Sequence, residues 1–452
     1  MGSNTTNSKY GPTRNSRVFC RTDRDFLTSQ QDRLELHAID PPSQSPPLSD
    51  EDRAELLSCP ALFPYLSSGG SSGGSSSSVA YRSSFASLCT DTGGSVRLPA
   101  SRVGVFGLKP TYGRISRHGV IPYASSLDTV GIITPTAADA ALVLDALTAN
   151  AADNDTDRDA TMSDDQFMFP TSCIVSHRRL ELGKKRSTQP PLHGVTVGLP
   201  ASYVVDELPP AVRAAWSAAL SKLASLGATV VLVPVESLPV ANVRASLSAY
   251  YVLACAEAAS NLAKYDGVRY GRRLRDKNFD YRDEAAHTRR HLFGEEVVRR
   301  VLCGSFVSSK EGDQVSAATK LRRDLAKDLE ACLAGSEKGQ ADILLLPTVL
   351  SPPADIRALF PEAAGAEQPG GGEMKDGGGL DPTMAFADDI MTVGASLAGL
   401  PACSVPVEDF LGLQLVGKRH GEELLLHVAR VFEENWWAER GGREGETGRG
   451  YI

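Results

Sequence analysis

The sequence GGSSGGS at residues 69–75 is followed by DTGGSVRLPA at residues 91–100 and by GLKPTYG at residues 107–113. Glycines that flank serines let the backbone adopt positive φ and approach a ligand closely. The turn at residues 92–95 can therefore point consecutive N–H groups into one concavity, as in an anion nest or an oxyanion hole. The first block alone is typical of a flexible linker. The second and third blocks are not linker composition, so the three together predict a functional site.

The bulk composition is that of a globular protein, with 452 residues, 42% of them hydrophobic and 23% charged. The formal net charge of −8 argues against a broad phosphate-binding surface, so a nucleic-acid partner would be bound locally or by another subunit. No run of 18 apolar residues occurs, and we expect no membrane span. The eight cysteines form no CxxC pair, which disfavours a disulfide framework or a zinc knuckle.

Histidines do not suggest an alternative chemistry. His287 and His291 have the spacing of a helical metal pair, but HTRRH lacks the glutamate of H-E-x-x-H. His118 lies in a loop-like segment, and the sequence has no G-x-S-x-G elbow for Ser-His-Asp catalysis. We therefore expect neither a metal site nor a histidine-based triad.

The periodicity between residues 195 and 233 predicts a strand, a helix and a second strand. Residues 195–199 form a short apolar run, and Pro210 opens a stretch with apolar residues at helical spacing. Gly227 is placed to end that helix at C′, and residues 229–233 form a β-branched run. Strands joined in this way pair in parallel through a right-handed crossover.

Other segments extend the α/β pattern. A helix near residues 317–333 precedes an apolar run at 342–346, and the T-x-x-D sequence at 136–139 predicts a capping box that opens a helix ending near Leu147. The predicted fold class is α/β, with a largely helical excursion near 240–340.

Three stretches have the composition of insertions in an otherwise single domain spanning residues 1–452. They are polar or Gly-rich and show no apolar periodicity, so we expect surface loops or disordered segments at residues 16–66, 151–192 and 360–380.

The three blocks closely resemble the amidase signature, which combines a Gly/Ser-rich loop with DTGGS-[IV]-R-x-P-A and GLKPTYGR. The resemblance implies a Ser–Ser–Lys triad on an amidase-signature fold, with a large mixed, mostly parallel sheet covered by helices. Motif against motif, the nucleophile is Ser95, and the bridging serine, which follows a cis peptide in the family, is Ser71. The oxyanion hole falls on the N–H groups of Thr92, Gly93, Gly94 and Ser95, whereas Arg97 is expected to brace the nucleophile loop.

The chemistry needs a base because serine is a weak nucleophile and an amide is a poor electrophile. In the family a buried, neutral lysine takes the proton through the bridging serine, since burial lowers the pKa of a lysine. Collapse of the tetrahedral intermediate releases ammonia and leaves an acyl group on Ser95, which water or another acceptor then removes.

Further segments resemble the A subunits of glutamyl-tRNA(Gln) amidotransferases, a branch of this family. Amidases that act on fatty amides or malonamide do not share the longest of them, YYVLACAEAASNLAKYDGVRYG. The matching segments are residues 1–15, 250–271, 295–306 and 383–392.

This second resemblance implies the substrate contacts. Arg300 would bind the α-carboxylate of glutamine and Asp389 its α-ammonium, a pairing that suits a zwitterion. One extra residue in TMAFADDIMT leaves Asp388 as the alternative to Asp389.

The same resemblance implies the setting of the reaction. The expected partners are glutamine, the other subunits of a glutamyl-tRNA(Gln) amidotransferase and, mainly through a partner subunit, Glu-tRNA(Gln), with no membrane. We expect no cofactor or metal in this subunit, and ATP and Mg²⁺ at a partner subunit. A mitochondrial location is expected, with a transit peptide upstream of this chain.

The family's catalytic lysine is not matched in the sequence. It belongs to a Lys-[Asp/Glu]-Asn motif upstream of MGS, and neither Lys9 nor Lys109 matches it. We expect a catalytic domain that lacks its N-terminal part, from a glutaminase whose start is missing. The alternatives are a non-catalytic scaffold or remnant of that subunit, and an amidase acting on another small amide. A retained intron would equally explain residues 16–66.

Overall fold

One sheet organises the described part of the chain. The computed structural model describes residue 13 and residues 66–148, 189–238, 243–274, 280–309, 313–334, 340–350, 353, 388–408 and 410–440. Its strands are β1 (Ser87–Asp91), β2 (Phe106–Lys109), β3 (Thr129–Thr134), β4 (Thr196–Pro200), β5 (Thr229–Val233), β6 (Ile343–Pro347), β7 (Ala402–Glu408) and β8 (Leu411–Gly417). They form a single eight-stranded sheet in the order β1-β3-β2-β7-β8-β6-β4-β5.

The sheet is mixed, as expected, but its described pairings are mostly antiparallel. Strand β4 pairs in parallel with β5 and with β6. The pairs β1–β3, β2–β3, β2–β7, β6–β8 and β7–β8 are antiparallel. The expectation of a mostly parallel sheet is therefore wrong for this part of the chain. Helical crossovers give parallel neighbours where β4 pairs with β5 and β6. Helix α4 likewise joins β1 to β2, but β3 lies between these two strands and is antiparallel to both, and β7 and β8 form a hairpin.

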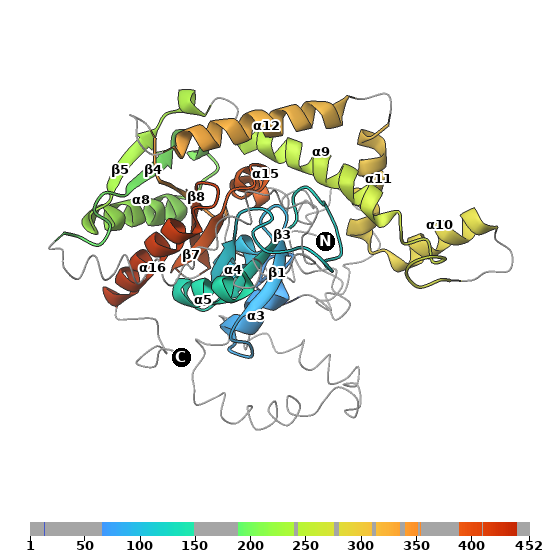
Figure 1. Cartoon of the computed structure of the whole chain (residues 1–452), viewed down its shortest axis with the longest axis horizontal. Coiled ribbons are helices and arrows are strands. Elements are labelled where there is room, and N and C mark those ends of the chain that lie inside the picture. The colour runs from blue at the N-terminus through green and yellow to red at the C-terminus, as the bar shows by residue number, and fades with distance from the viewer. Residues whose placement is uncertain are drawn as a thin grey trace, which may run out of the picture.

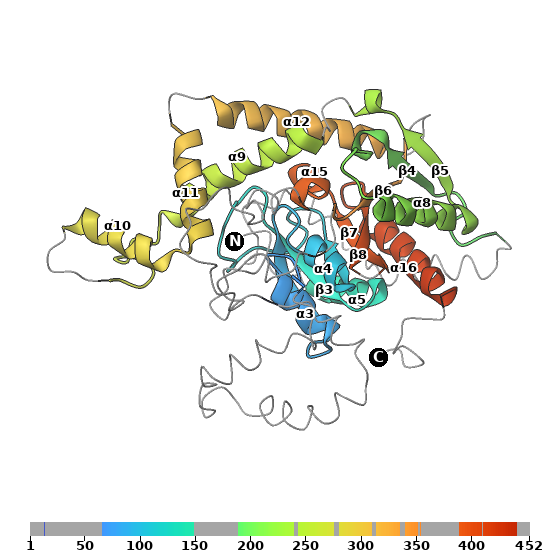
Figure 2. The same cartoon turned by 180° about the vertical axis from the view of Figure 1, so that it is seen from behind.

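The helices lie on the sheet and along one side of it (Figure 1). Those nearest the sheet are α3 (Gly73–Ala80), α4 (Arg97–Val103), α5 (Ala137–Thr148), α8 (Pro210–Ser225), α15 (Val393–Leu397) and α16 (Glu422–Ala438). The predicted helical excursion is confirmed as α9 (Val243–Leu262), α10 (Tyr281–Leu292), α11 (Glu295–Val307) and α12 (Gln314–Cys332). Both views show α10 projecting from the body (Figures 1 and 2). Short 3₁₀ turns are η3 (Ala201–Tyr203), η4 (Val235–Ser237) and η6 (Asp388–Met391).

Apolar side chains pack against both faces of the sheet. Ile132 and Ile133 are neighbours in β3, and successive strand residues point to opposite faces. Ile132 belongs to the large core, which contains residues of α5, α8, α9, α12 and α16. Ile133 belongs to a smaller cluster with α3 and α4, made by Val79, Val96, Ala100 and Val105. The turn at residues 92–96, called the nucleophile turn below, lies between β1, which is buried only at Asp91, and α4, whose residues are all buried.

The strand–helix–strand prediction around α8 is confirmed. Pro210 stands at the first turn of α8, and Gly227 follows its end with φ +98°. Only a glycine adopts this conformation without strain, so Gly227 ends the helix at C′ as expected. The capping box is confirmed in part: the Thr136 hydroxyl accepts from Asp139 N at 3.2 Å, but the Asp139 carboxylate bonds that same hydroxyl.

The predicted insertions fall mainly outside the described residues. Residues 16–65 and 360–380 lie entirely outside them, as do residues 151–188. The predicted segment 151–192 reaches too far, because Leu192 is buried in the core and donates its N–H to Leu226 O at 2.9 Å.

None of the described helices is long and apolar enough to cross a membrane.

Candidate active site

The Gly/Ser block and the DTGGS block meet at one turn. Strand β1 ends at Asp91 and α4 begins at Arg97, so the residues between them turn at the sheet edge. Ser95 is half-buried in this turn, and its carbonyl accepts the Ser72 N–H at 3.2 Å. The neighbouring Ser71 is exposed, and its bond to Gly70 is cis, as in the family geometry. The two predicted serines therefore lie on segments that are in direct contact.

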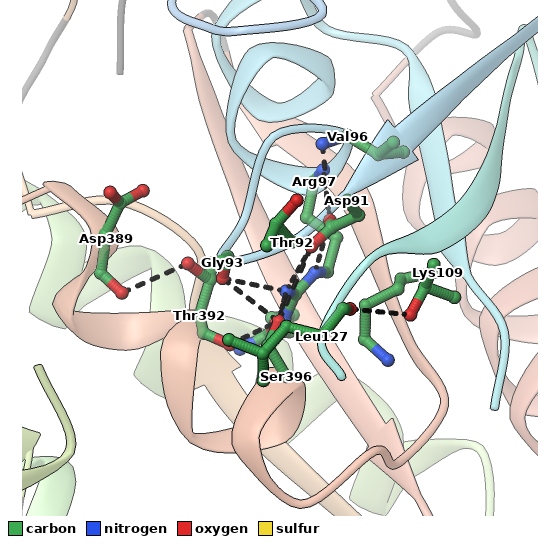
Figure 3. A network of polar contacts seen from close by, with 12 residues as sticks. Asp91, Thr92, Gly93, Val96, Arg97, Lys109, Leu127, Asp389, Thr392 and Ser396 are labelled. Carbon is green, nitrogen blue, oxygen red and sulfur yellow. Dashed lines mark hydrogen bonds and ion pairs between the residues drawn. The ribbon is translucent and has the colours of Figure 1, made fainter. Parts of the chain in front are cut away.

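Arg97 binds the nucleophile turn and the residues next to it through several hydrogen bonds. It is fully buried and forms a two-point ion pair with Asp91, from Nε at 2.9 Å and from Nη2 at 2.8 Å. Nη2 also donates to Gly93 O at 3.0 Å and Nη1 to Thr392 O at 2.9 Å (Figure 3). Ser396 Oγ and Gln414 Oε1 complete its acceptors at 2.7 and 2.5 Å. Arg97 braces the nucleophile loop, as expected.

The charge of Asp91 depends on this contact. Burial alone would raise the pKa of Asp91, but the charge and hydrogen bonds of Arg97, with Lys109 and the Val96 N–H, hold the pKa below its usual value. The Asp91 carboxylate also accepts the N–H groups of Val96 and Arg97 at 3.2 and 3.4 Å. The turn is thus held by an ionised pair that water does not reach.

Two glycines let other segments touch the turn. A Cβ on Gly93 would lie 2.6 Å from Cζ of Tyr250, and a Cβ on Gly94 would lie 2.9 Å from Thr392 Cβ and closer still to its hydroxyl. Real Cβ atoms essentially never approach so closely. The glycines are therefore needed for close packing against α9 and against the segment after η6, besides any role of their N–H groups.

The predicted Asp389 lies beside two tyrosines of α9. Its carboxylate accepts the Tyr251 hydroxyl at 2.7 Å, and Tyr251 packs edge-on against Tyr250 with ring centroids 5.0 Å apart. Asp389 is buried, and the alternative Asp388 opens η6, although its side chain lies outside the described part of the structure. The contact with Tyr251 favours Asp389 as the anion of the site.

The predicted Arg300 faces the same tyrosines from α11. Burial raises the pKa of Tyr250. The nearby Tyr123 and Asp389 raise the pKa of Tyr250 further, and Arg300 lowers it. Burial and Asp389 likewise raise the pKa of Tyr251, which Arg300 opposes. The two residues are distant in sequence, and the fold brings both charges within electrostatic range of one tyrosine pair that touches the nucleophile turn.

Arg300 has its own partners in the structure. It is buried and donates from Nε to the Tyr123 hydroxyl at 3.1 Å. Its Nη1 pairs with Glu296 Oε2 at 2.5 Å, one helical turn earlier. Burial raises the pKa of the Tyr123 hydroxyl, which is therefore a neutral acceptor. These contacts fix the guanidinium beside Tyr123.

A second buried carboxylate touches the turn. Asp128 Oδ1 accepts the Thr92 hydroxyl at 2.7 Å, and Oδ2 accepts the N–H groups of Tyr123 and Ala124 at 2.8 and 3.0 Å. Burial raises the pKa of Asp128. The loop at residues 123–128 is therefore tied to the proposed oxyanion residues.

Lys109 is bound to backbone carbonyls. It is fully buried at the end of β2, and Nζ donates to Leu400 O at 2.6 Å and to Pro110 O at 3.2 Å. Burial, aided by Arg97, lowers the pKa of Lys109 to about 7. These hydrogen bonds join β2 to the residues before β7. They fit the structural role expected for the GLKP lysine.

Sequence reasoning missed Tyr123, Tyr250, Tyr251 and Asp128. The one available signal was the tyrosine pair that opens the segment 250–271, where two aromatic side chains interrupt a small-residue helix. Their partners come from four different segments, which no local pattern reveals. His287 and His291 instead bond within α10, where His291 Nδ1 lies 2.9 Å from His287 O.

Comparison with known proteins agrees with this geometry. A model of the amidase family matches residues 63–426. Among glutamyl-tRNA(Gln) amidotransferase A subunits, the mitochondrial protein of Candida albicans is 38% identical over 362 residues, which cover 80% of this chain and 73% of the relative. The mitochondrial protein of Neurospora crassa is 40% identical over 406 residues, covering 81% and 73%. The bacterial protein of Rhizorhabdus wittichii is 37% identical over 390 residues, covering 83% and 69%.

Solved structures show the same fold. Among glutamyl-tRNA(Gln) amidotransferase A subunits, the Thermotoga maritima protein superposes with a TM-score of 0.55 at 28% identity, covering 82% of this chain and 67% of that one. A 6-aminohexanoate cyclic dimer hydrolase reaches a TM-score of 0.60 at 24% identity, covering 82% and 68%, which supports the fold alone. The chain therefore belongs to the amidase family of enzymes, and its similarity to glutamyl-tRNA(Gln) amidotransferase A subunits extends over about 80% of its length.

Proposed function

We propose that this chain is the glutamine amidohydrolase subunit of a glutamyl-tRNA(Gln) amidotransferase. The observation that carries the proposal is the convergence of the nucleophile turn, Arg300 and Asp389 on the tyrosine pair Tyr250–Tyr251. A buried cation and a buried anion that both act on one tyrosine pair suit a ligand that carries both charges. Glutamine is such a ligand, and its side-chain amide is the bond to be cleaved.

In this proposal the two charges orient glutamine. The α-carboxylate binds the Arg300 guanidinium and the α-ammonium binds Asp389. Both protein groups are buried, so these contacts are worth more than they would be in water. The bound zwitterion then directs its side chain toward the turn that holds Ser95.

The chemical step uses the two serines. Ser95 Oγ attacks the Cδ carbonyl of glutamine while its proton passes through Ser71 to a lysine base. That lysine belongs to the family's Lys-[Asp/Glu]-Asn motif, which residues 1–452 do not contain. The N–H groups of residues 92–95 stabilise the tetrahedral oxyanion. The C–N bond then breaks, the returned proton leaves with ammonia, and water hydrolyses the glutamyl ester on Ser95.

The relatives supply the wider setting of the proposal. The ammonia serves to convert Glu-tRNA(Gln) to Gln-tRNA(Gln), and the tRNA binds mainly to a partner subunit, which agrees with the net charge of −8 on this chain. ATP and Mg²⁺ belong to that partner, and this chain needs no cofactor. The fungal relatives from Candida and Neurospora are mitochondrial proteins, which supports a mitochondrial location.

The proposal is tested with the chain extended upstream through the Lys-[Asp/Glu]-Asn motif and assembled with the other subunits of an amidotransferase. Ammonia release from glutamine and formation of Gln-tRNA(Gln) from Glu-tRNA(Gln) are measured in the same sample. We expect both activities. Ammonia release without formation of Gln-tRNA(Gln) would show that the chain is a glutamine amidase outside tRNA amidation. Hydrolysis of simple amides but not of glutamine would contradict the assignment.

A further inference from the structure

A single arginine of α12 joins two segments that reach the site. Arg322 donates from Nη1 to Ser126 Oγ at 2.7 Å and from Nη2 to Ser126 O at 2.8 Å. Its Nε donates to Leu397 O, at the end of α15, at 2.9 Å. The planar guanidinium thus binds a loop through Nη1 and Nη2 and a helix end through Nε.

The loop side of this contact is reinforced from α9. Glu257 Oε2 accepts the Ser126 N–H at 2.9 Å, and Oε1 accepts the Ser126 hydroxyl. The hydroxyl accepts from Arg322 and donates to Glu257, so its proton has one favourable position. Asn261 adds a hydrogen bond from Nδ2 to Tyr123 O at 3.1 Å. Side chains from two long helices therefore fix this loop.

Each joined segment supports one half of the proposed glutamine clamp, which we define as Arg300 and Asp389. The loop that carries Ser126 also carries Tyr123, whose hydroxyl accepts from Arg300. On the other side, Leu397 ends the helix that continues from η6, where Asp389 O accepts the Thr392 N–H at 3.0 Å. Displacing one segment against the other changes the separation between the guanidinium of Arg300 and the carboxylate of Asp389.

We propose that Arg322 is a positioning residue that sets this separation and so makes the site selective for ligands carrying both a carboxylate and an ammonium. The inference rests on the proposed function, because it assumes that Arg300 and Asp389 bind the two charges of glutamine. A ligand with only one of these groups uses one half of the clamp and is insensitive to the spacing. A zwitterion uses both halves, and an error of about 1 Å can cost it up to roughly a hundredfold.

The experiment measures binding, which needs no catalytic base. Glutamine, glutaramate (no α-ammonium) and 4-aminobutanamide (no carboxylate) are titrated into the full chain carrying Ser95→Ala, by calorimetry or ligand-observed NMR. Arg322→Met removes the guanidinium with its hydrogen-bond donors, and Arg322→Lys keeps the positive charge without the planar guanidinium. Arg323→Met is the matched control, because Arg323 is the next residue of α12 and its side chain is 64% exposed. Unfolding midpoints are recorded for every variant.

In Arg322→Met we expect the Kd for glutamine to rise about tenfold or more. The Kd values for the two single-charge ligands should change less than about twofold, as should every Kd in Arg323→Met. Arg322→Lys should follow Arg322→Met in direction, which keeps the test open if Arg322→Met does not fold.

An equal loss for all three ligands would make Arg322 a general structural residue and overturn the inference, as would an unchanged Kd for glutamine. If the chain with Arg322 intact does not bind glutamine, the proposed function falls, and the inference falls with it. That outcome differs from glutamine binding that is insensitive to Arg322.

Discussion

Replacing Arg97 with methionine tests how the nucleophile turn is held. The substitution leaves the Asp91 carboxylate buried, with the charge of its ion-pair partner removed. Removing one partner of such a pair costs about 3–5 kcal/mol, because the other charge stays uncompensated. Thr392 O loses the Arg97 donor as well, and Gly93 O keeps the Ser396 hydroxyl at 3.2 Å. We expect Arg97→Met to lower the free energy of unfolding by about 3–5 kcal/mol at neutral pH.

The loss should depend on pH in a defined direction. In the wild type the pKa of Asp91 is lowered, so its favourable contribution is present above the unfolded pKa of about 3.9 and disappears below it. Without Arg97, burial dominates and raises the pKa of Asp91. A carboxylate whose pKa is raised by folding destabilises the native state only at pH values above its unfolded pKa. This destabilisation becomes smaller as acidification protonates the carboxylate. The destabilisation should therefore be smaller near about pH 4.5 than near about pH 7.

Urea unfolding at both pH values measures this directly, and Asp91→Asn combined with Arg97→Met should recover part of the loss. Arg244→Met is the control, since its ion pair with Glu207 is exposed to solvent and its loss should change the free energy of unfolding little. A loss below about 1 kcal/mol in Arg97→Met, or an equal loss at both pH values, would refute the role assigned to the ion pair.

Three further predictions concern residues around the turn. Gly94→Ala should destabilise the fold by about 1–3 kcal/mol in urea unfolding, because its Cβ meets Thr392. Gly74→Ala in α3 should not destabilise it, because the nearest atom to the new Cβ is Thr13 Oγ1 at 4.0 Å. Lys109 has a pKa lowered to about 7 by burial, so between about pH 7 and 10 the unfolded state binds more protons and stability rises with pH. Relative to Lys109→Met, the wild type should gain up to about 1.4 kcal/mol per pH unit, and an equal pH dependence would contradict this. Arg300→Ala should weaken glutamine binding by about 2–5 kcal/mol and spare a simple amide, as Kd values would show; equal losses would make Arg300 structural.

The sequence could predict what local physics decides. Pro210 and Gly227 mark the ends of α8, and the runs on either side pair in parallel, because a short crossover leaves little choice. The Gly/Ser and DTGGS blocks identified the turn, since glycines at those positions are needed only where other segments approach closely.

Long-range contacts could not be predicted in this way. Strand β2 pairs antiparallel with its neighbour in sequence, β3, and with β7, which is about 300 residues away. The mostly parallel sheet that the resemblance implied is seen, among the described strands, where β4 pairs with β5 and β6. Likewise, Arg322 reads as one charge among many on an amphipathic helix. Its contacts to Ser126 and Leu397 appear only after the helices have packed.

The central claim, that Ser95 is the nucleophile of a glutamine hydrolase, is tested most directly by the rate of ammonia release from glutamine. The rate is compared between two forms of the amidotransferase, one assembled with this chain extended upstream through the Lys-[Asp/Glu]-Asn motif and the other carrying Ser95→Ala in the same extended chain. Serine is half-buried at this position and alanine fits the same turn, so the unfolding midpoint should not change. The account predicts a fall in kcat on the order of 10⁴- to 10⁶-fold. A variant that retains activity within about tenfold of the wild type would contradict the account.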